Sequence, residues 1–465
     1  MRHRISIVFL AAALRLTAQQ PADSSQVTQQ ILERLDALEK QNRELLDEVR
    51  LLRKTMDANR TTASSATGAP ATAKTTESDG TAQNPQPPLD ERVAVQERRT
   101  AEQAQTKVEA AHKLPIQLDG MLLFNAFSNS ENYSAATSGN YGLLSGPSSS
   151  GATLRQSLLG FDFQGPSLPG NGHINGSLMM DFFGGNADPG SIQVRLRQAY
   201  ISMDWANRSF TVGQLKPLIS PYQPDSLAEV GIPALAGAGN LWLWLPQARY
   251  EERTHLGAKN GLTSQLAVLQ TDETYSNVPT QFSSTLEQAR PALEGRFAFW
   301  HKFDDTRKFE IAPGFHLSST HVAGTSVGSH IGSVDWLVTP ASWLRFSGTF
   351  FKGQNVAGLG SLGTGFVILA NGDVRPVNST GGWAQMSLPL TSRLTFNVFG
   401  GLENDHSPYL SATSIVRNWN YASNVMYHLG PNVVVSLEAL QLRTRSFAGS
   451  NGVQNHYDLA IGYLF

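Results

Sequence analysis

Residues 455–465 read NHYDLAIGYLF, and apolar or aromatic residues alternate with polar or small ones along this stretch. Apolar or aromatic residues occupy every second position from Tyr457: Tyr457, Leu459, Ile461, Tyr463 and Phe465. Successive side chains of a strand point to opposite faces, so these five residues share one face. An exposed apolar edge is a liability in a soluble sheet, whereas a strand that faces lipid carries this pattern with aromatics at the interface. The stretch therefore predicts a lipid-facing strand, with a buried strand of a secreted β-sandwich as the alternative.

The same alternation recurs upstream. Leu344, Phe346 and Phe350 share one face, with Arg345 opposite them, and the segment 393–398 repeats the pattern. Short segments of this kind, separated by Gly, Pro, Asn and Asp, are typical of a large antiparallel sheet. About sixteen segments fit: 116–127, 153–165, 173–183, 192–204, 209–215, 247–256, 262–270, 291–302, 308–320, 330–338, 343–352, 382–388, 393–404, 415–428, 433–445 and 455–465.

The lengths of the links separate a membrane barrel from a soluble sandwich. Links after even-numbered segments are short and turn-like, such as WANR and LGPN, whereas most of the others are longer. Short turns on one side and long loops on the other are typical of a transmembrane barrel. We therefore predict an all-β fold, a transmembrane antiparallel β-barrel of about 16 strands over residues 114–465, preceded by a periplasmic α-helical coiled coil. A barrel of that size leaves an aqueous channel.

Composition excludes several classes of protein. The chain of 465 residues is 40% hydrophobic, and it shows no apolar stretch of about 20 residues after its N-terminal region, as membrane helices would require. It contains no cysteine, so disulfides, thiolate nucleophiles and cysteine-ligated metals are excluded. A net charge of −2 offers no electrostatic case for a nucleic-acid partner. We expect no cofactor and no metal.

The N-terminal residues have the character of a signal peptide over 1–18. Arg2 and Arg4 precede an apolar run from Ile5 to Leu14, and small residues end at Ala18. Export is therefore expected, with a non-exported protein that has an apolar start as the alternative.

Residues 26–56 carry a heptad pattern. The seam reads Ile31, Leu35, Leu38, Asn42, Leu45, Val49, Leu52 and Met56. Apolar residues spaced alternately by four and three predict a coiled coil, dimeric or trimeric, with a lone amphipathic helix as the alternative. Residues 57–113 are rich in Thr, Ala, Ser, Pro and charged residues, which predicts a linker and spacer.

The stretch from Arg155 to Arg253 resembles the DcaP-like trimeric porins, a family related in architecture to the phosphate-selective porins. The motifs that carry this resemblance are Asp-Phe-Phe-Gly at 181–184, Arg-Leu-Arg-Gln-Ala-Tyr at 195–200, Gly-Gln at 213–214 and Pro-Gln-Ala-Arg at 246–249. A coiled coil ahead of the barrel is also a feature of that family. Where the family tends to have arginines, this chain has Leu158 and Trp244, and both departures remove positive charge.

The resemblance implies an outer-membrane porin that forms a homotrimer and passes small hydrophilic solutes, such as small anions and carboxylates. The final strand resembles the C-terminal signal that the barrel-assembly machinery reads. Outer-membrane lipid, that machinery and peptidoglycan are then the expected partners. The alternative is a structural protein of the envelope, whose coiled coil contacts the cell wall while the barrel serves as its anchor.

Charged residues on polar faces are the candidates for solute selection, because selection in a channel is electrostatic. The pore-lining candidates are Arg155, Arg195, Arg197, Arg249, Glu251 and Arg253. Charge on a lipid-facing surface costs about 2–4 kcal/mol at mid-membrane, so these residues should point inward. They form either a selectivity ladder or structural pairs with acids such as Asp181. The long link Lys216–Leu245 is the expected constriction loop, with Asp225 and Glu229 as its acids.

Patterns that would indicate an enzyme are weak. Gly358, Gly360 and Gly363 match GxGxxG but lack the flanking strand and helix of a dinucleotide site. His316 and His321 are five residues apart in an expected strand and should face opposite ways. We therefore expect a channel and not an enzyme. From residue 114 on, 20 lysines and arginines stand against 23 aspartates and glutamates, so charge selectivity depends on where these residues lie.

Overall fold

The computed structural model describes residues 116–137, 139–185, 192–276 and 278–465. The signal peptide, the coiled coil and the linker predicted from the sequence lie outside these residues. No helix in the described part of the chain is long and apolar enough to cross a membrane.

The described chain is built almost entirely of strands. They are β1 (Ile116–Asn129), β2 (Ser149–Thr153), β3 (Leu158–Leu168), β4 (Gly172–Gly184), β5 (Gln193–Asp204), β6 (Arg208–Leu215), β7 (Leu245–His255), β8 (Asn260–Gln270), β9 (Pro291–Lys302), β10 (Lys308–Val322), β11 (Thr325–Ala341), β12 (Leu344–Gln354), β15 (Asn378–Pro389), β16 (Leu394–His406), β17 (Ile415–His428), β18 (Val433–Ser446) and β19 (Asn451–Leu464). A small hairpin, β13 (Phe366–Ile368) and β14 (Val374–Pro376), and three 3-10 helices, Glu273–Tyr275, Thr280–Thr285 and Ala357–Leu359, lie in the links.

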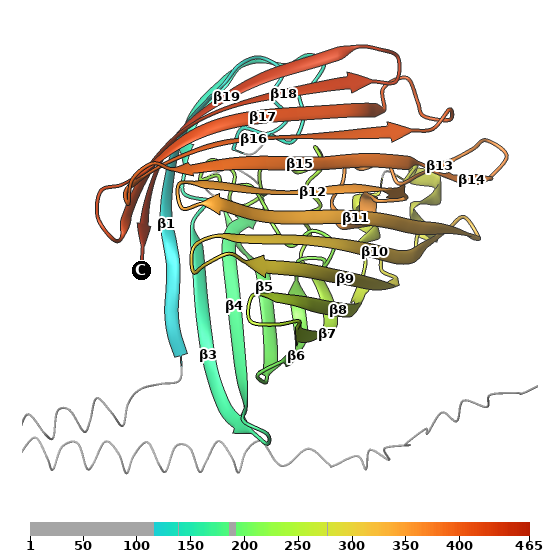
Figure 1. Cartoon of the computed structure of the whole chain (residues 1–465). Helices are drawn as coiled ribbons and strands as arrows, with labels where there is room; N and C mark the ends of the chain where they lie inside the picture. The colour runs from blue at the N-terminus through green and yellow to red at the C-terminus, as the bar shows by residue number, and fades with distance from the viewer. Residues whose placement is uncertain (1–115, 138, 186–191, 277) are drawn as a thin grey trace, which may run out of the picture. The chain divides into compact units, whose positions relative to one another are not determined.

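These strands form one closed antiparallel barrel. From β3 on, each strand of the barrel pairs with the next barrel strand along the chain, β12 with β15 across the small hairpin, and β19 returns to pair with β1 over Met121↔Leu464 to Asn129↔His456. Figure 1 shows cyan β1 and red β19 meeting at this closure. β2 and β3 both pair with β1, one with each half of it, so they share one place in the wall. The barrel thus has sixteen strand positions, which confirms the predicted all-β fold and strand number.

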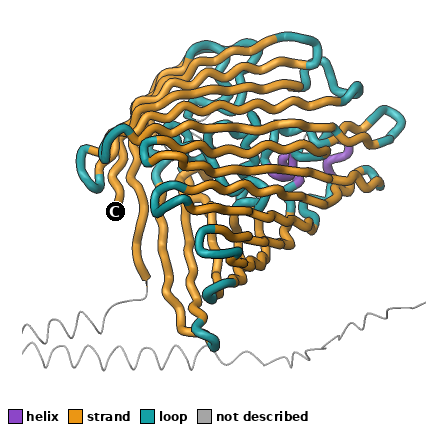
Figure 2. The backbone as a smooth tube through the Cα atoms, in the orientation of Figure 1, coloured by secondary structure: helices purple, strands orange, loops and turns teal. Residues whose placement is uncertain are grey.

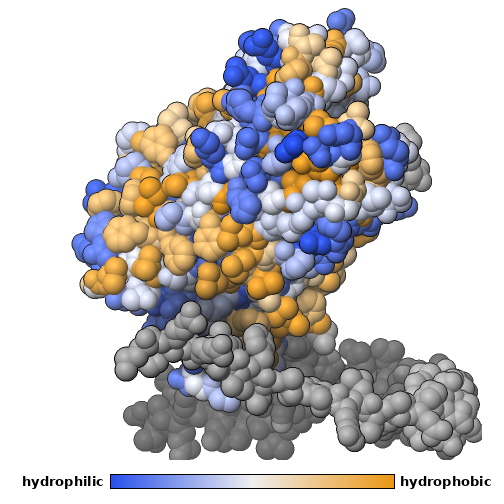
Figure 3. All heavy atoms as spheres, turned by 90° about the vertical axis from the view of Figure 1, so that its right-hand side faces the viewer, coloured by the Kyte–Doolittle hydropathy of each residue, from blue (hydrophilic) through white to orange (hydrophobic). Residues whose placement is uncertain are grey.

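The two ends of the barrel differ, as the link lengths predict. Tight turns join strands at one end, at 169–171, 205–207, 256–259, 303–307, 342–343, 390–393 and 429–432. The long links lie at the other end (Figure 2), among them 216–244, 271–290 and 355–377. Seen from that end, hydrophilic and hydrophobic side chains are intermingled (Figure 3).

One link was predicted wrongly. The sequence predicts a long link between the segments 308–320 and 330–338, but β10 and β11 extend into it and join through Ala323 and Gly324 alone. Both residues have positive φ, 51° and 71°, as a tight two-residue hairpin turn requires. Polar residues such as Ser318 and Ser326 occupy both faces of these strand ends, because both faces meet water beyond the lipid. The apolar–polar alternation that predicts a strand is therefore absent there.

The outward face of the barrel is apolar. In β19, Tyr457, Leu459, Ile461 and Tyr463 are exposed, while Asp458 and Ala460 between them are buried. The same alternation exposes Leu122 and Phe124 in β1, Phe297 and Phe299 in β9, and Phe346 and Phe350 in β12. A continuous belt of this kind is the surface that a barrel presents to hydrocarbon.

The closure generates a first prediction. Phe465 donates its N–H to the Gly120 carbonyl (3.2 Å) and accepts from the Gly120 N–H (3.0 Å), and its ring covers the space where a Cβ of Gly120 would lie. We expect deletion of Phe465 to lower the amount of heat-modifiable, folded protein in the membrane, because it removes both the last two bonds of the seam and an outward aromatic. Channels that do assemble should conduct normally, since Phe465 lies outside the lumen. Normal folded levels together with an altered unit conductance would contradict this account.

Candidate functional site

The link 216–244, which we call the constriction loop, folds into the barrel and packs on its inner wall. Its residues belong to three buried apolar clusters, which is unexpected for a polar lumen. Leu235 packs with Phe399 and Leu440, and Val230 packs with Met121 and Leu123. The inner wall therefore carries large apolar side chains where the loop covers them and polar ones elsewhere.

Hydrogen bonds tie the constriction loop to strands around most of the ring. On one side, the Leu218 N–H donates to Glu294 of β9 (2.6 Å), and the Tyr222 hydroxyl donates to Glu310 of β10 (2.8 Å). Across the lumen, the Ser226 hydroxyl bonds Glu438 of β18 (2.8 Å). The loop is thus held from opposite walls and narrows the interior.

Asp225 and Glu229, the predicted acids of this loop, have different surroundings. Asp225 pairs with Arg345 of β12 and accepts from Gln385 Nε2 (2.6 Å). Its side chain remains 43% exposed. Glu229 is buried, and burial raises its pKa well above the usual value, with the nearby carboxylates of Glu438 and Asp458 raising it further.

Close backbone contact joins the loop to β15 and β16. A Cβ on Gly401 of β16 would lie 2.1 Å from the Ala238 carbonyl oxygen, so only glycine fits there. Gly239 has φ +95°, and a Cβ on it would lie 2.3 Å from the Gly382 oxygen. Glycine on both sides lets the loop lie directly against the wall.

Two of the predicted arginines converge on one carboxylate. Asp181, fully buried, pairs with Arg195 (2.6 Å) and lies 3.5 Å from Arg197. Arg195 also donates to the Gly231 carbonyl (2.6 Å), and Arg197 to that of Val230 (2.7 Å). These two arginines thus act as structural partners of an acid and of the loop, and Arg195, with 27% of its side chain exposed, keeps access to solvent.

Aromatic rings complete this basic cluster. Arg155, in the break between β2 and β3, donates to the Phe182 and Phe183 carbonyls and stacks over the Phe183 ring at 4.4 Å. Trp244, one of the two departures from the family pattern, covers Arg197 at 4.4 Å. Cation–π contact replaces a charge at this position and holds the arginine in place.

The predicted residues of β7, Arg249, Glu251 and Arg253, also lie on the inner face, but they do not belong to the basic cluster around Asp181. Arg249 donates to the Lys216 carbonyl (2.8 Å), at the start of the constriction loop. Arg253 pairs with Glu251 (2.5 Å) and is 45% exposed, toward the short turns.

Lys216, at the start of the constriction loop, has a lowered pKa. Burial, and secondarily the charge of Arg197, lower the pKa of Lys216 to about 7.

Acids gather on β16, β18 and β19, strands that approach the basic cluster from the other side of β1. Glu403 and Asp405 of β16, Glu438 of β18 and Asp458 of β19 are all buried on the inner face. These four acids were not predicted as site residues, although inward charge in a predicted strand was a usable sign. Gln156 was not predicted either; its side chain accepts from the Val230 and Gly231 N–H groups and donates to the Ala228 carbonyl. Gln156 lies in the break between two strands, where no pattern marks it.

The other sequence patterns lie apart from this site. His316 is buried on the inner face and bonds Glu294 (2.9 Å), while His321 lies on the outer face near Glu287, so the two histidines do face opposite ways. Gly358 and Gly360 belong to a 3-10 helix and its cap in the link between β12 and β15.

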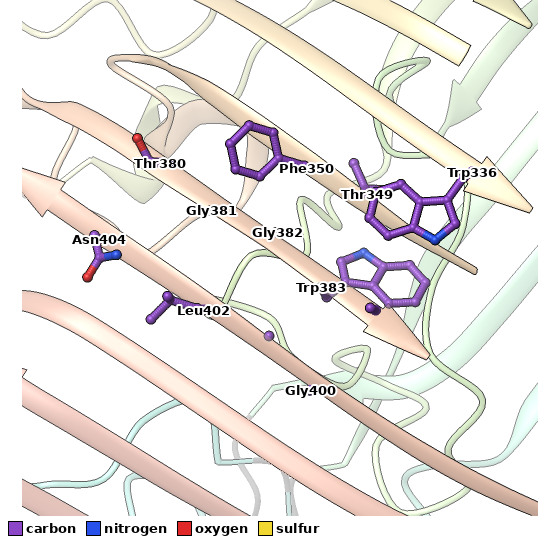
Figure 4. A pocket seen from close by; sticks show the side chains of 12 residues that line it. Trp336, Thr349, Phe350, Thr380, Gly381, Gly382, Trp383, Gly400, Leu402 and Asn404 are labelled. Atoms are coloured by element: carbon purple, nitrogen blue, oxygen red, sulfur yellow. The ribbon is translucent and has the colours of Figure 1, made fainter. Parts of the chain in front are cut away.

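A hollow of about 460 Å³ lies on the outward side of β12, β15 and β16. Figure 4 shows Gly382 and Gly400 flanked by Trp336, Phe350 and Leu402. No charged side chain lines it, and it faces away from the lumen, so it fits an apolar surface better than a solute.

Solved structures share this fold. No family model matches the chain, and no curated protein matches it. The outer membrane channel DcaP of Acinetobacter baumannii superposes with a TM-score of 0.62 at 16% identity, over 75% of this chain and 97% of that one. The anion-selective porin from Comamonas acidovorans gives 0.52 at 13% identity, over 75% and 99%. OmpF of Salmonella typhi, in complex with daunomycin, gives 0.51 at 10%, over 75% and 97%. The resemblance to DcaP-like porins is thereby confirmed for the fold.

The contact between loop and wall generates a second prediction. We expect Gly401→Val to push the constriction loop off β15 and β16, because its side chain would overlap the Ala238 carbonyl, at a cost of about 1–3 kcal/mol. The barrel should still fold, and the single-channel conductance in planar bilayers should rise. Gly332→Val is the matched control, since no atom lies within 4 Å of the added Cβ on that outward position. Equal conductance in both variants and the wild type would rule out this contact as a determinant of pore width.

Proposed function

We propose that the barrel is an outer-membrane channel through which small hydrophilic solutes diffuse passively, with the constriction loop as its narrowest part. The observation that carries this proposal is the loop itself, hydrogen-bonded to β9 and β10 on one side and to β18 on the other. A link held in this way extends across a wide barrel and narrows its interior. The shared fold with outer-membrane channels supports the same conclusion.

The arrangement of charge supports electrostatic selection. Arg195 and Arg197 pair with the carboxylate of Asp181, and Arg155 lies beside them over the Phe183 ring without an ion pair to any described carboxylate, so this side carries excess positive charge. The acids of β16, β18 and β19 occupy the part of the wall beyond β1. A solute that passes along this part of the wall meets positive charge beside negative charge, and fixed charges act strongly where little water is present. We propose a modest preference for small anions such as carboxylates, since Arg195 is the solvent-accessible member of the basic cluster.

Assembly as a homotrimer is part of the proposal. The outward face offers an apolar hollow beside Trp336 and Phe350, and small residues there allow another barrel to approach closely. Lipid and the barrel-assembly machinery are the partners that an apolar belt and an aromatic final strand would need.

Reconstitution into planar bilayers tests the proposal. We expect conductance in groups of three equal steps. In a KCl gradient, we expect a reversal potential with the sign of a pore that passes chloride more easily than potassium. Arg195→Gln should shift that potential toward potassium, because it removes the accessible positive charge. The paired change Arg253→Gln with Glu251→Gln removes a neutral ion pair and should leave the potential unchanged. A barrel that inserts but does not conduct, or an Arg195→Gln channel with unaltered selectivity, would count against the proposal.

Selectivity should also depend on pH. Lys216, with its pKa near 7, is positive at pH 6 and largely neutral at pH 8, and Glu229, with its raised pKa, gains negative charge over a higher pH range than an ordinary carboxyl. Both changes make the lumen more negative as pH rises, so the preference for chloride over potassium should fall between pH 6 and 8. Lys216→Arg should remove most of this dependence, because arginine stays charged throughout. If the selectivity of Lys216→Arg and of Lys216→Arg/Glu229→Gln depended on pH as steeply as that of the wild type, neither group would be the source of the pH dependence.

A further inference from the structure

Two arginines lie opposite each other on the outward side of the barrel. Arg417 of β17 and Arg445 of β18 are Cα partners in the ladder, and both are exposed. Their neighbours Asn418 and Thr444 are buried on the inner face, so alternation directs the arginines outward. Like charges directly opposite each other destabilise a strand pair. An anion bound between the two guanidinium groups would offset this repulsion.

No carboxylate of the described chain supplies that anion. Arg417 Nε donates to the neutral Asn404 side chain (2.5 Å), and Arg445 forms no ion pair with any described residue. Arg443, next on the same face of β18, bonds Gln441 and covers the Tyr421 ring. Three outward arginines therefore lie together without an ion pair to any described carboxylate.

A hollow of about 610 Å³ opens beside this pair. Its lining includes Asn404, His406, Pro408, Arg417, Arg445 and Phe447. One carboxylate, Asp405, also lines it, but Asp405 is buried, accepts from the Ser379 hydroxyl and forms no ion pair with either arginine. Guanidinium groups in pairs suit the geometry and charge of phosphate. We call this group of residues the arginine rim.

The position of the rim along the barrel points to a lipid. Trp419 and Tyr421 follow Arg417 on the same outward face of β17, in the direction away from the long links. They are aromatics of the kind found at a membrane interface. Farther along lies a mainly apolar hollow of about 560 Å³, lined by Phe396, Val425, Leu437, Tyr457 and Leu459. Asn424, Glu438 and Asp458, which are buried on the inner face, also border it. A cationic site above an apolar hollow suits an amphiphile with a charged headgroup and acyl chains.

A second copy of this chain is a poor source of the anion. Among the described strands, alternation places one acid outward, Glu252 of β7. It is the ladder partner of Arg208, near the short turns and away from the rim. The outward strand surface thus offers no acidic patch that could face Arg417 and Arg445 at the same level.

We propose that the arginine rim binds the phosphorylated headgroup of a lipid in the membrane leaflet next to the long links, with the acyl chains along β16–β19. This inference rests on the proposed membrane location and is independent of what passes through the lumen.

The test uses the purified full-length protein in detergent and native mass spectrometry with three probes: diphosphorylated lipid A, the same lipid dephosphorylated, and inorganic phosphate. We expect the wild type to bind the phosphorylated lipid at least about tenfold more tightly than the dephosphorylated one, the difference that a pair of charge-assisted hydrogen bonds provides. Arg417→Gln/Arg445→Gln should lose this preference. Arg208→Gln is the matched control, because Arg208 is an exposed outward arginine with an acid opposite, and it should retain the preference.

Several results would overturn the inference. Equal binding of the two lipids, or a double variant that binds like the wild type, would remove the role of the arginines. Inorganic phosphate that displaces the lipid completely would indicate a site for free anions. Dissociation of the oligomer in the double variant with lipid binding intact would indicate an interface between copies. Heat-modifiability checks folding, and conductance of the same samples separates a failure of the channel proposal, seen as absent current, from a failure of this one.

Discussion

Every backbone N–H and C=O in hydrocarbon needs a partner, and in this chain the pairing of β1 with β19 provides the last of them. An unpaired edge at that depth costs several kcal/mol per group, so an open sheet of these strands could not reside in a membrane. The register from Met121↔Leu464 to Asn129↔His456 closes the ring, and Gly120 and Phe465 extend it by two further bonds. Closure also explains why side chains are distributed in the opposite way to those of a soluble protein. Because no edge remains, the outward faces can be apolar and the inward faces polar.

A ring of sixteen strands encloses more space than wall side chains fill, and the constriction loop takes up part of it. The loop is stabilised in two ways at once. Leu235 and Val230 lie in apolar clusters with the wall, and hydrogen bonds from Gln156, Arg195 and Arg197 satisfy its carbonyl and N–H groups. A buried loop with unsatisfied backbone groups would be costly, so these polar anchors are as necessary as the apolar contact.

The arginines of this barrel do different work on its two faces. Inside, they are neutralised or ordered by specific partners, such as Asp181 for Arg195 and the Trp244 ring for Arg197. Outside, near the long links, Arg417 and Arg445 lie opposite each other and form no ion pair with a described carboxylate. Burial makes a charge without partners expensive, so the inward arginines have carboxylate, carbonyl or aromatic partners, whereas a solvated or lipid headgroup environment tolerates the outward pair.

The sequence by itself determined what depends on local periodicity. Alternation in segments such as 455–465 predicts the barrel and its lipid face, and the cost of charge in lipid predicts that Arg195, Arg197 and Arg249 point inward. Only the tertiary structure decided which inward residues meet. Gln156 anchors the loop from a position without any pattern, Glu438 reaches Ser226 across the lumen, and Arg417 faces Arg445 through the ladder register. These contacts join residues far apart in sequence, and they depend on strand register and on the path of a long loop. A one-residue shift of either would change every partner while leaving the local pattern intact.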